Sequence, residues 1–170
     1  MNKQLKLLNK QTTERQPVMT LEQLIAKQEI QELVNVFSNL ADERNAQGQG
    51  PLFTEDAVLE FQMGPEGEVH EIPGRDAIVA AFENTVGANS TAKAVYHANG
   101  QLSVTLADDL QSATGINYCM ATLVNDEDGK DVIITNYVRY ADQYVKIDGR
   151  WYIKRRRTCF LISEKRPYNG

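Results

Sequence analysis

The chain has 170 residues, a length typical of one domain with its own hydrophobic core. Its hydrophobic content of 42% is too high for intrinsic disorder, and no apolar run approaches the ~18 residues of a membrane span. With 18 basic against 23 acidic residues, the net charge of −5 argues against general nucleic-acid binding. We therefore expect a globular domain with no nucleic-acid and no membrane partner.

The cysteines and the first residues bear on the compartment. Cys119 and Cys159 are too few for a disulfide scaffold and match no zinc motif, so we interpret them as half-buried thiols in a reducing compartment. The apolar stretch from Leu5 to Leu8 is too short for a signal-peptide core. We expect a cytoplasmic protein in which residues 1–19 form a polar N-terminal arm.

A long amphipathic helix of about 25 residues is predicted from Thr20 onward. Thr20 and Gln23 have the spacing of a capping box, and Met19 and Leu24 have that of a hydrophobic staple. Apolar residues then recur at helical spacing: Leu24, Ile25, Ile30, Leu33, Val34, Phe37, Leu40 and Ala41. The glycine-rich stretch 45–51 is expected to end the helix.

Strands dominate the rest of the chain. After a helical turn at 52–53 we expect a strand at 57–63, a loop at 64–67 and a second helix from Pro73-Gly74 to about Gly87. Four segments rich in Val, Ile, Thr and Tyr then predict an antiparallel meander: 94–106, 112–125, 131–147 and 150–163. Asp148-Gly149 is a strong signal for a two-residue hairpin. Helices first and strands later indicate an α+β fold, followed by a C-terminal tail at 164–170.

The long helix needs a broad partner. A helix of this length spans about 40 Å, and a strongly curved sheet around it would bury its apolar stripe. Such a sheet would leave a concave, mostly apolar cavity at its open end, the kind of place where small ligands bind.

Several short motifs follow a recognisable order along residues 20–163. They are Phe37 with Asp42, Leu52-Phe53 with Glu55-Asp56, Gly74 to Ile78, Val95-Tyr96-His97, and Asp148 to Trp151. The set resembles the SnoaL-like (polyketide cyclase-like) branch of the nuclear transport factor two superfamily, related to scytalone dehydratase and ketosteroid isomerase. The resemblance implies a cone-shaped α+β barrel, with the long helix packed in a curved, mainly antiparallel mixed sheet. It also implies a pocket at the wide end and a homodimer formed through sheet faces.

The resemblance makes Asp42 and His97 the candidate catalytic pair, because their positions match an Asp and a His that meet in the pocket of dehydratase-like members. A histidine near its ordinary pKa can remove a proton next to a carbonyl, and a carboxylate fixes its tautomer. By residue pattern alone, Asp42 also reads as a solvated carboxylate near a helix end. His97 shares the polar face of its strand unless a bulge at Gly100 turns it inward.

The chain also departs from the family pattern. Phe37 stands where a tyrosine is often found, and residues 117–125 contain no second histidine. The resemblance places Tyr140 where scytalone dehydratase has a pocket amide, which makes it the third catalytic candidate. Its hydroxyl is a candidate replacement donor, as are those of Tyr118 and Tyr96. The residues expected to bind substrate are Phe37, Phe53, Phe61, Tyr96, Tyr118 and Arg155.

The remaining charged clusters read as structural. His70, near Glu68 and Glu71, is interpreted as part of a solvated loop, and the acidic stretch 126–131 lacks the calcium-binding pattern. No metal ligand set and no phosphate-binding loop is predicted. In the basic run 154–157, Arg155 and Arg157 share strand parity with Trp151, so one of them is a candidate to point inward. The alternative is that they pair with acidic side chains across the sheet or form a dimer contact.

The leading hypothesis is a small-molecule enzyme that performs proton transfer without a cofactor, as an isomerase, dehydratase or cyclase acting on an apolar carbonyl or hydroxyl compound. Two alternatives stay open. One is a non-catalytic ligand-binding or dimerisation module of the same fold. The other is the structural beta subunit of a ring-hydroxylating dioxygenase.

Overall fold

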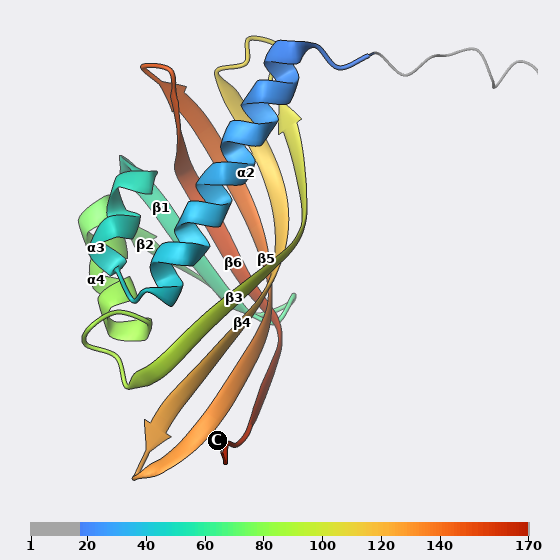
Figure 1. The fold of residues 1–170 in the computed structure, drawn as a ribbon. Helices are drawn as coiled ribbons and strands as arrows, with labels where there is room; N and C mark the ends of the chain where they lie inside the picture. Colours follow the sequence, from blue (N-terminus) through green and yellow to red (C-terminus); the bar gives the residue numbers. More distant parts are fainter. Residues whose placement is uncertain (1–17, 170) are drawn as a thin grey trace, which may run out of the picture.

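The computed structural model describes residues 18–169, so the predicted N-terminal arm lies almost entirely outside the described residues (Figure 1). In chain order the elements are α2 (Leu21–Asp42), α3 (Ala46–Gln49), the 3-10 helix η1 (Gly50–Leu52), β1 (Phe53–Met63), β2 (Val69–Pro73), α4 (Arg75–Thr85), β3 (Ala92–Leu106), β4 (Ser112–Glu127), β5 (Lys130–Ile147) and β6 (Arg150–Pro167). Among these residues, none of the helices is long and apolar enough to cross a membrane.

Helix α2 begins as the sequence predicts. The Gln23 backbone N–H donates to Thr20 Oγ1 at 3.2 Å, and the Thr20 N–H donates to Gln23 Oε1 at 3.0 Å, which completes the capping box. One face of the helix is buried: Ala26, Ile30, Leu33, Val34, Phe37, Ser38 and Ala41. All its apolar members except Ala41 form one core cluster with Phe53, Tyr144, Trp151 and Ile153. The stripe predicted from the sequence therefore packs against the sheet.

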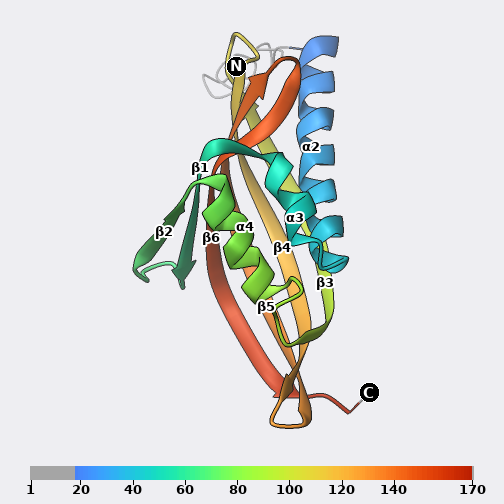
Figure 2. The same ribbon diagram turned by 90° about the vertical axis from the view of Figure 1, so that its left-hand side faces the viewer.

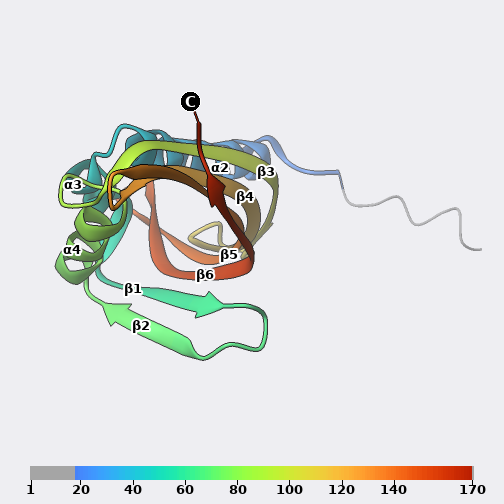
Figure 3. The ribbon, with the colours of Figure 1, turned by 90° about the horizontal axis from the view of Figure 1, so that it is seen from below.

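The six strands form one mixed sheet in the order β2-β1-β6-β5-β4-β3. Only the β1–β6 pair is parallel, and the other four pairs are antiparallel. Seen from below, the sheet curves around an interior space, with α3 and α4 along its open side (Figure 3). Figure 2 shows α3 and α4 in front of the strands, with α2 along the right-hand side. The predicted α+β class with a strongly curved sheet is confirmed.

The first part of the sheet differs from the prediction. Strand β1 begins at Phe53 rather than at residue 57, and residues 46–49 of the predicted break form the short helix α3. The predicted loop around His70 is wrong, because His70 lies in β2 opposite Phe61, with the two rings stacked 5.1 Å apart. Pairing with β1 makes this short polar segment a strand. Tertiary context decides whether such a segment forms a strand more than its local composition does.

Strand β6 runs four residues past the predicted segment 150–163, to Pro167. The hairpin before it has the expected turn, with Asp148 and Gly149 at φ of 49° and 79°. Between β5 and β6 the register shifts after the pair Tyr144–Ile153, so that Gln143 faces Arg155 and Lys154 is an extra residue. This bulge exchanges the two faces of β6 from residue 155 to 160, and a second register shift between Phe160 and Ile162 reverses the exchange.

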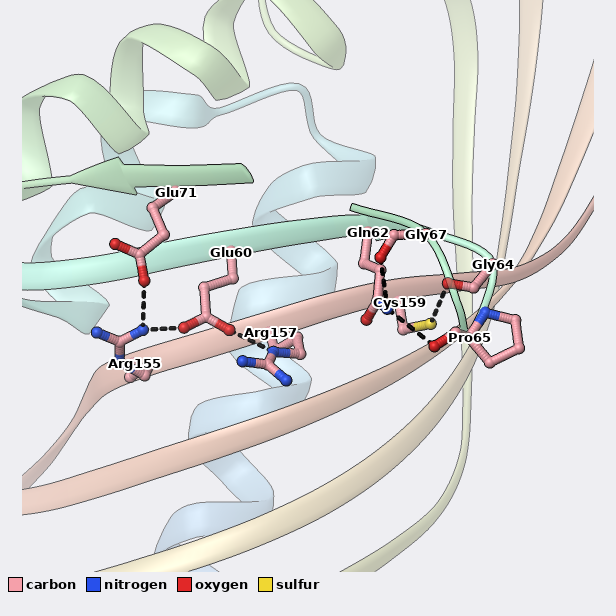
Figure 4. A network of polar contacts seen from close by, with 9 residues as sticks. All are labelled: Glu60, Gln62, Gly64, Pro65, Gly67, Glu71, Arg155, Arg157 and Cys159. Atoms are coloured by element: carbon pink, nitrogen blue, oxygen red, sulfur yellow. Dashed lines mark hydrogen bonds and ion pairs between the residues drawn. The ribbon is translucent and has the colours of Figure 1, made fainter. Parts of the chain in front are cut away.

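The bulge makes the inward orientation of Arg155 or Arg157 wrong, whereas the alternative, pairing with acidic side chains across the sheet, is confirmed. Arg155 and Arg157 lie on the outer face of the sheet, and both pair with Glu60 of β1 (Figure 4). Arg155 also contacts Glu71 of β2 at 3.0 Å. The Glu60 side chain is only 2% exposed. These contacts join β2, β1 and β6 at the region where β1 and β6 pair in parallel.

Candidate functional site

Asp42 and His97 lie in contact at the inner wall of the curved sheet. Asp42 is the last residue of α2, and His97 lies in β3. His97 Nδ1 is 2.7 Å from Asp42 Oδ1, and the His97 backbone N–H donates to Asp42 Oδ2 at 3.1 Å. The His97 side chain is 8% exposed and that of Asp42 is 28% exposed. One carboxylate therefore holds both the ring and the backbone of the histidine.

The orientation of His97 depends on a bulge in β3. The pairing of β3 with β4 shifts between Asn99 and Leu102, at the position where a bulge at Gly100 is predicted. His97 consequently faces inward while Leu102 and Val104, beyond the bulge, still pack against the core. Asn99, next to the bulge, donates to Ser38 Oγ of α2 at 2.9 Å, which joins the strand to the helix near the dyad.

A cavity of about 390 Å³ opens beside His97. Most of its lining is aliphatic or aromatic, and the lining residues come from α2, α3, α4 and all six strands of the sheet. The lining residues are Phe37, Ala41, Gln49, Leu59, Phe61, Ile72, Ala81, Phe82, Thr85, Val86, His97, Ala121, Leu123, Asn136, Val138, Tyr140, Arg156, Thr158 and Phe160. A concave apolar space with a few polar groups is typical of small-molecule sites.

Arg156 is a charged residue in the lining of this cavity, and it is not among the site residues predicted from the sequence. Its guanidinium is fully buried and bidentate on Asp142, with Nε to Oδ1 at 2.9 Å and Nη2 to Oδ2 at 2.7 Å. Tyr144 donates its hydroxyl to the same carboxylate at 2.7 Å. Burial acts to lower the pKa of Arg156, but the Asp142 carboxylate outweighs it and the net pKa is raised, so the group stays charged.

Two aromatic rings sandwich this cation. The Arg156 guanidinium carbon lies 4.2 Å from the ring centroid of Phe37 and 4.5 Å from that of Tyr140. Burial raises the pKa of Tyr140 far above its ordinary value, so its hydroxyl remains protonated. Tyr140, a catalytic candidate from the sequence, therefore lines the cavity as a neutral phenol beside the arginine.

The other sequence candidates divide into two groups. Phe37 and Phe61 line the cavity, whereas Phe53 is fully buried in the core, 6.1 Å from the Phe37 ring. Tyr96 and Tyr118 are 59% and 37% exposed because they alternate with inward-facing neighbours and point to the outer face. They lie outside the cavity, as does Arg155, which the β6 bulge turns outward.

Two observations concern metals and thiols. Within residues 18–169, no three His, Cys, Asp or Glu side chains cluster in a way that would hold a metal ion.

Cys119 and Cys159 are both free and buried. Burial raises the pKa of the Cys119 thiol to about 11; the charge of Arg156 acts to lower this pKa and that of Asp42 to raise it.

The chain matches the family model of the SnoaL-like domain over residues 22–157 and belongs to that family. None of the curated proteins matches it.

Solved structures share its fold. A candidate scytalone dehydratase from Novosphingobium aromaticivorans has a TM-score of 0.70 at 23% identity, covering 88% of this chain and 91% of that one. A type 2 hexachlorocyclohexane dehydrochlorinase, LinA, has a TM-score of 0.68 at 17% identity, covering 88% and 93%. ActVI-ORFA from Streptomyces coelicolor has a TM-score of 0.59 at 22% identity, covering 78% and 94%. At these identities the likeness concerns the fold.

Proposed function

We propose that this protein is an enzyme that moves a proton on a small organic substrate without a cofactor, in an isomerisation, elimination or cyclisation. The observation that carries the proposal is the Asp42–His97 contact at the wall of a largely apolar cavity that also contains the Arg156 cation. Two neighbours in fold are described by name as a dehydratase and a dehydrochlorinase. Both names denote eliminations, which is the reaction class we favour.

His97 would be the base. An ionised carboxylate only accepts hydrogen bonds, so its contact with Asp42 favours the tautomer that carries the proton on Nδ1. The Nε2 lone pair is then free to take a proton from a substrate carbon. Asp42 would stabilise the imidazolium that forms and keep the ring from rotating.

Arg156 would stabilise the negative charge that this step creates. When His97 takes a proton from the carbon next to a carbonyl, the C–H electron pair moves toward the carbonyl oxygen and forms an enolate. A fixed cation in an apolar cavity stabilises such an oxyanion. Return of the proton to another carbon gives an isomer. In an elimination, the adjacent carbon loses its hydroxyl with the bonding electrons, and His97 returns the proton to make water.

Deuterium exchange tests the proposal with simple substrates. We expect a panel of cyclic ketones and β-hydroxyketones in D₂O to show enzyme-dependent deuterium incorporation or loss of water by NMR. His97→Gln should reduce the rate by about 10²–10⁴-fold, the usual contribution of a general base. His70→Gln is the matched control at the other of the two histidines, and it should leave the rate unchanged.

A ligand-binding protein without catalysis is the second candidate. Phe37 favours it, because a phenylalanine offers no hydroxyl to polarise a substrate oxygen where the family often has a tyrosine. Saturable binding of panel compounds with no exchange in any of them would support this function. Exchange that survives in His97→Gln would contradict the enzyme proposal as drawn here.

A further inference from the structure

Gln49 is a second polar group in the cavity that the proposed chemistry does not use. It is the last residue of α3, the short helix that follows the turn after α2. The residue is 1% exposed and lines the same cavity as His97 and Arg156. A buried glutamine normally has partners for both its amide oxygen and its amide nitrogen, because unpaired polar groups are costly inside a protein.

One side of this amide is fixed by the protein. Gln49 Nε2 donates to the backbone carbonyl oxygen of Phe37 at 3.1 Å. Turning the amide over would set its oxygen against that carbonyl, and neither atom could donate. The contact therefore determines which way the amide lies. Gln49 Oε1 is left buried with no hydrogen-bond partner among residues 18–169.

The cavity has a second unpaired group of opposite character. Two of the three Arg156 nitrogens are held by Asp142, but Nη1 is buried and has no partner among the described residues. Gln49 Oε1 can only accept a hydrogen bond, and Arg156 Nη1 can only donate one. Besides His97, the largely apolar cavity thus has in its lining one residue with an unpaired acceptor and one with an unpaired cationic donor. A ligand that satisfies both carries a hydroxyl or N–H group as well as an acceptor oxygen.

We infer that Gln49 Oε1 is a ligand subsite that selects compounds with a hydrogen-bond donor. A hydrocarbon or a halogenated hydrocarbon would fill the cavity but leave this oxygen desolvated and unpaired, whereas an alcohol, phenol or amine would pair with it. The inference deepens the proposed function by narrowing the substrate class. It requires that the cavity binds a ligand, and it does not require that His97 is a base.

Isosteric probes test the subsite without turnover. We would measure binding of 1- and 2-naphthol and of 1- and 2-fluoronaphthalene, since fluorine has a similar size and cannot donate. The wild type should bind at least one naphthol about tenfold more tightly than its fluoro counterpart, the scale of one buried hydrogen bond. Gln49→Met keeps the volume and removes the acceptor, so it should abolish this preference while leaving fluoronaphthalene binding within about twofold.

Gln47→Met is the matched control. Gln47 is the other glutamine of α3, but it is exposed, lies outside the cavity lining and donates to Glu83 Oε1 at 3.1 Å, so its loss should not change the naphthol preference. Equal weakening of naphthol and fluoronaphthalene by Gln49→Met would show that Gln49 only supports the fold and would overturn the inference. A wild type with no naphthol preference, or no naphthol binding, would overturn it as well. A preference that survives when every ketone fails to exchange deuterium would sustain the subsite and refute the catalytic proposal alone.

Discussion

The buried Arg156–Asp142 pair shows how a single carboxylate stabilises a guanidinium cation in the lining of a largely apolar cavity. Both side chains are 1% exposed, and the bidentate geometry offsets the desolvation of two ions. The phenol of Tyr144 supplies a third hydrogen bond to Asp142. An apolar pair of the same volume would also pack there, so the ion pair is weak evidence for a gain in stability. Its position in the cavity wall is better evidence for a role in the site.

Asp142→Asn should destabilise the protein by roughly 3–5 kcal/mol, since it leaves the Arg156 cation buried without a counter-ion. The free energy of urea unfolding measures this loss. Asp131→Asn is the control, because Asp131 pairs with Lys93 while 36% exposed and should cost at most about 1 kcal/mol. Equal small losses in the two variants would refute the charge argument.

Cys119 should be unreactive in the folded protein. Burial disfavours the thiolate and raises its pKa to about 11, so at pH 8 only about one thiol in a thousand is ionised. In a Cys159→Ser background, N-ethylmaleimide at pH 8 should label Cys119 slowly until urea unfolds the chain. The labelling rate should rise as pH increases toward 11. Rapid labelling of the native protein at pH 8 would contradict this placement.

Residue-level prediction from the sequence succeeded where a residue has a fixed place in a motif order. Asp42 and His97 are named by that order, and the structure brings them into contact. Arg156 and Gln49 are not predictable in the same way. The orientation of Arg156 depends on one extra residue in β6, and the burial of Gln49 depends on how α3 packs after the turn. Strand alternation alone therefore selected Arg155 on the wrong face.

Among the elements, α2 illustrates how local signals set a boundary. Its start is encoded in four residues, from Thr20 to Gln23, and its buried face follows the 3.6-residue period. Helix and strand types were predictable over most of the chain for this reason. Strand β2 was not, because a short polar segment becomes a strand only through its pairing with β1.

Thr20→Ala should lower the free energy of unfolding by about 1 kcal/mol, because it removes the hydroxyl that accepts the Gln23 N–H. Chemical denaturation of the two proteins measures the difference. Thr20→Ser keeps the cap and should retain most of the stability. A serine variant as unstable as the alanine variant would show that the hydroxyl is not the cause.

The outer face of the whole sheet carries an apolar row that crosses four strands in direct register. Ala98, Met120, Tyr137 and Ile162 face one another in turn across β3, β4, β5 and β6. Tyr137 and Ile162 are 39% and 57% exposed, which is unusual for large apolar side chains in the middle of a sheet. We propose that a second copy of the chain covers this row, as the family resemblance implies.

Sedimentation tests this homodimer. The wild type should sediment with the mass of a dimer, and Ile162→Arg should shift it to the monomer by placing a charge in the row. Ile147→Arg, at another exposed isoleucine beside the 148–149 hairpin, should leave the dimer intact. A wild type that stays monomeric at high concentration, or an Ile162→Arg dimer, would refute the proposal.

The proposed catalysis depends on which nitrogen of one imidazole beside the cavity carries the proton. Nitrogen-15 NMR of His97, in a His70→Gln background that leaves a single histidine, measures it directly at a pH where the ring is neutral. We predict a proton on Nδ1, shared with Asp42, and an unprotonated Nε2, with this tautomer preference lost in Asp42→Asn. A ring that carries its proton on Nε2 in the wild type would leave no lone pair facing the substrate and would contradict the proposed base.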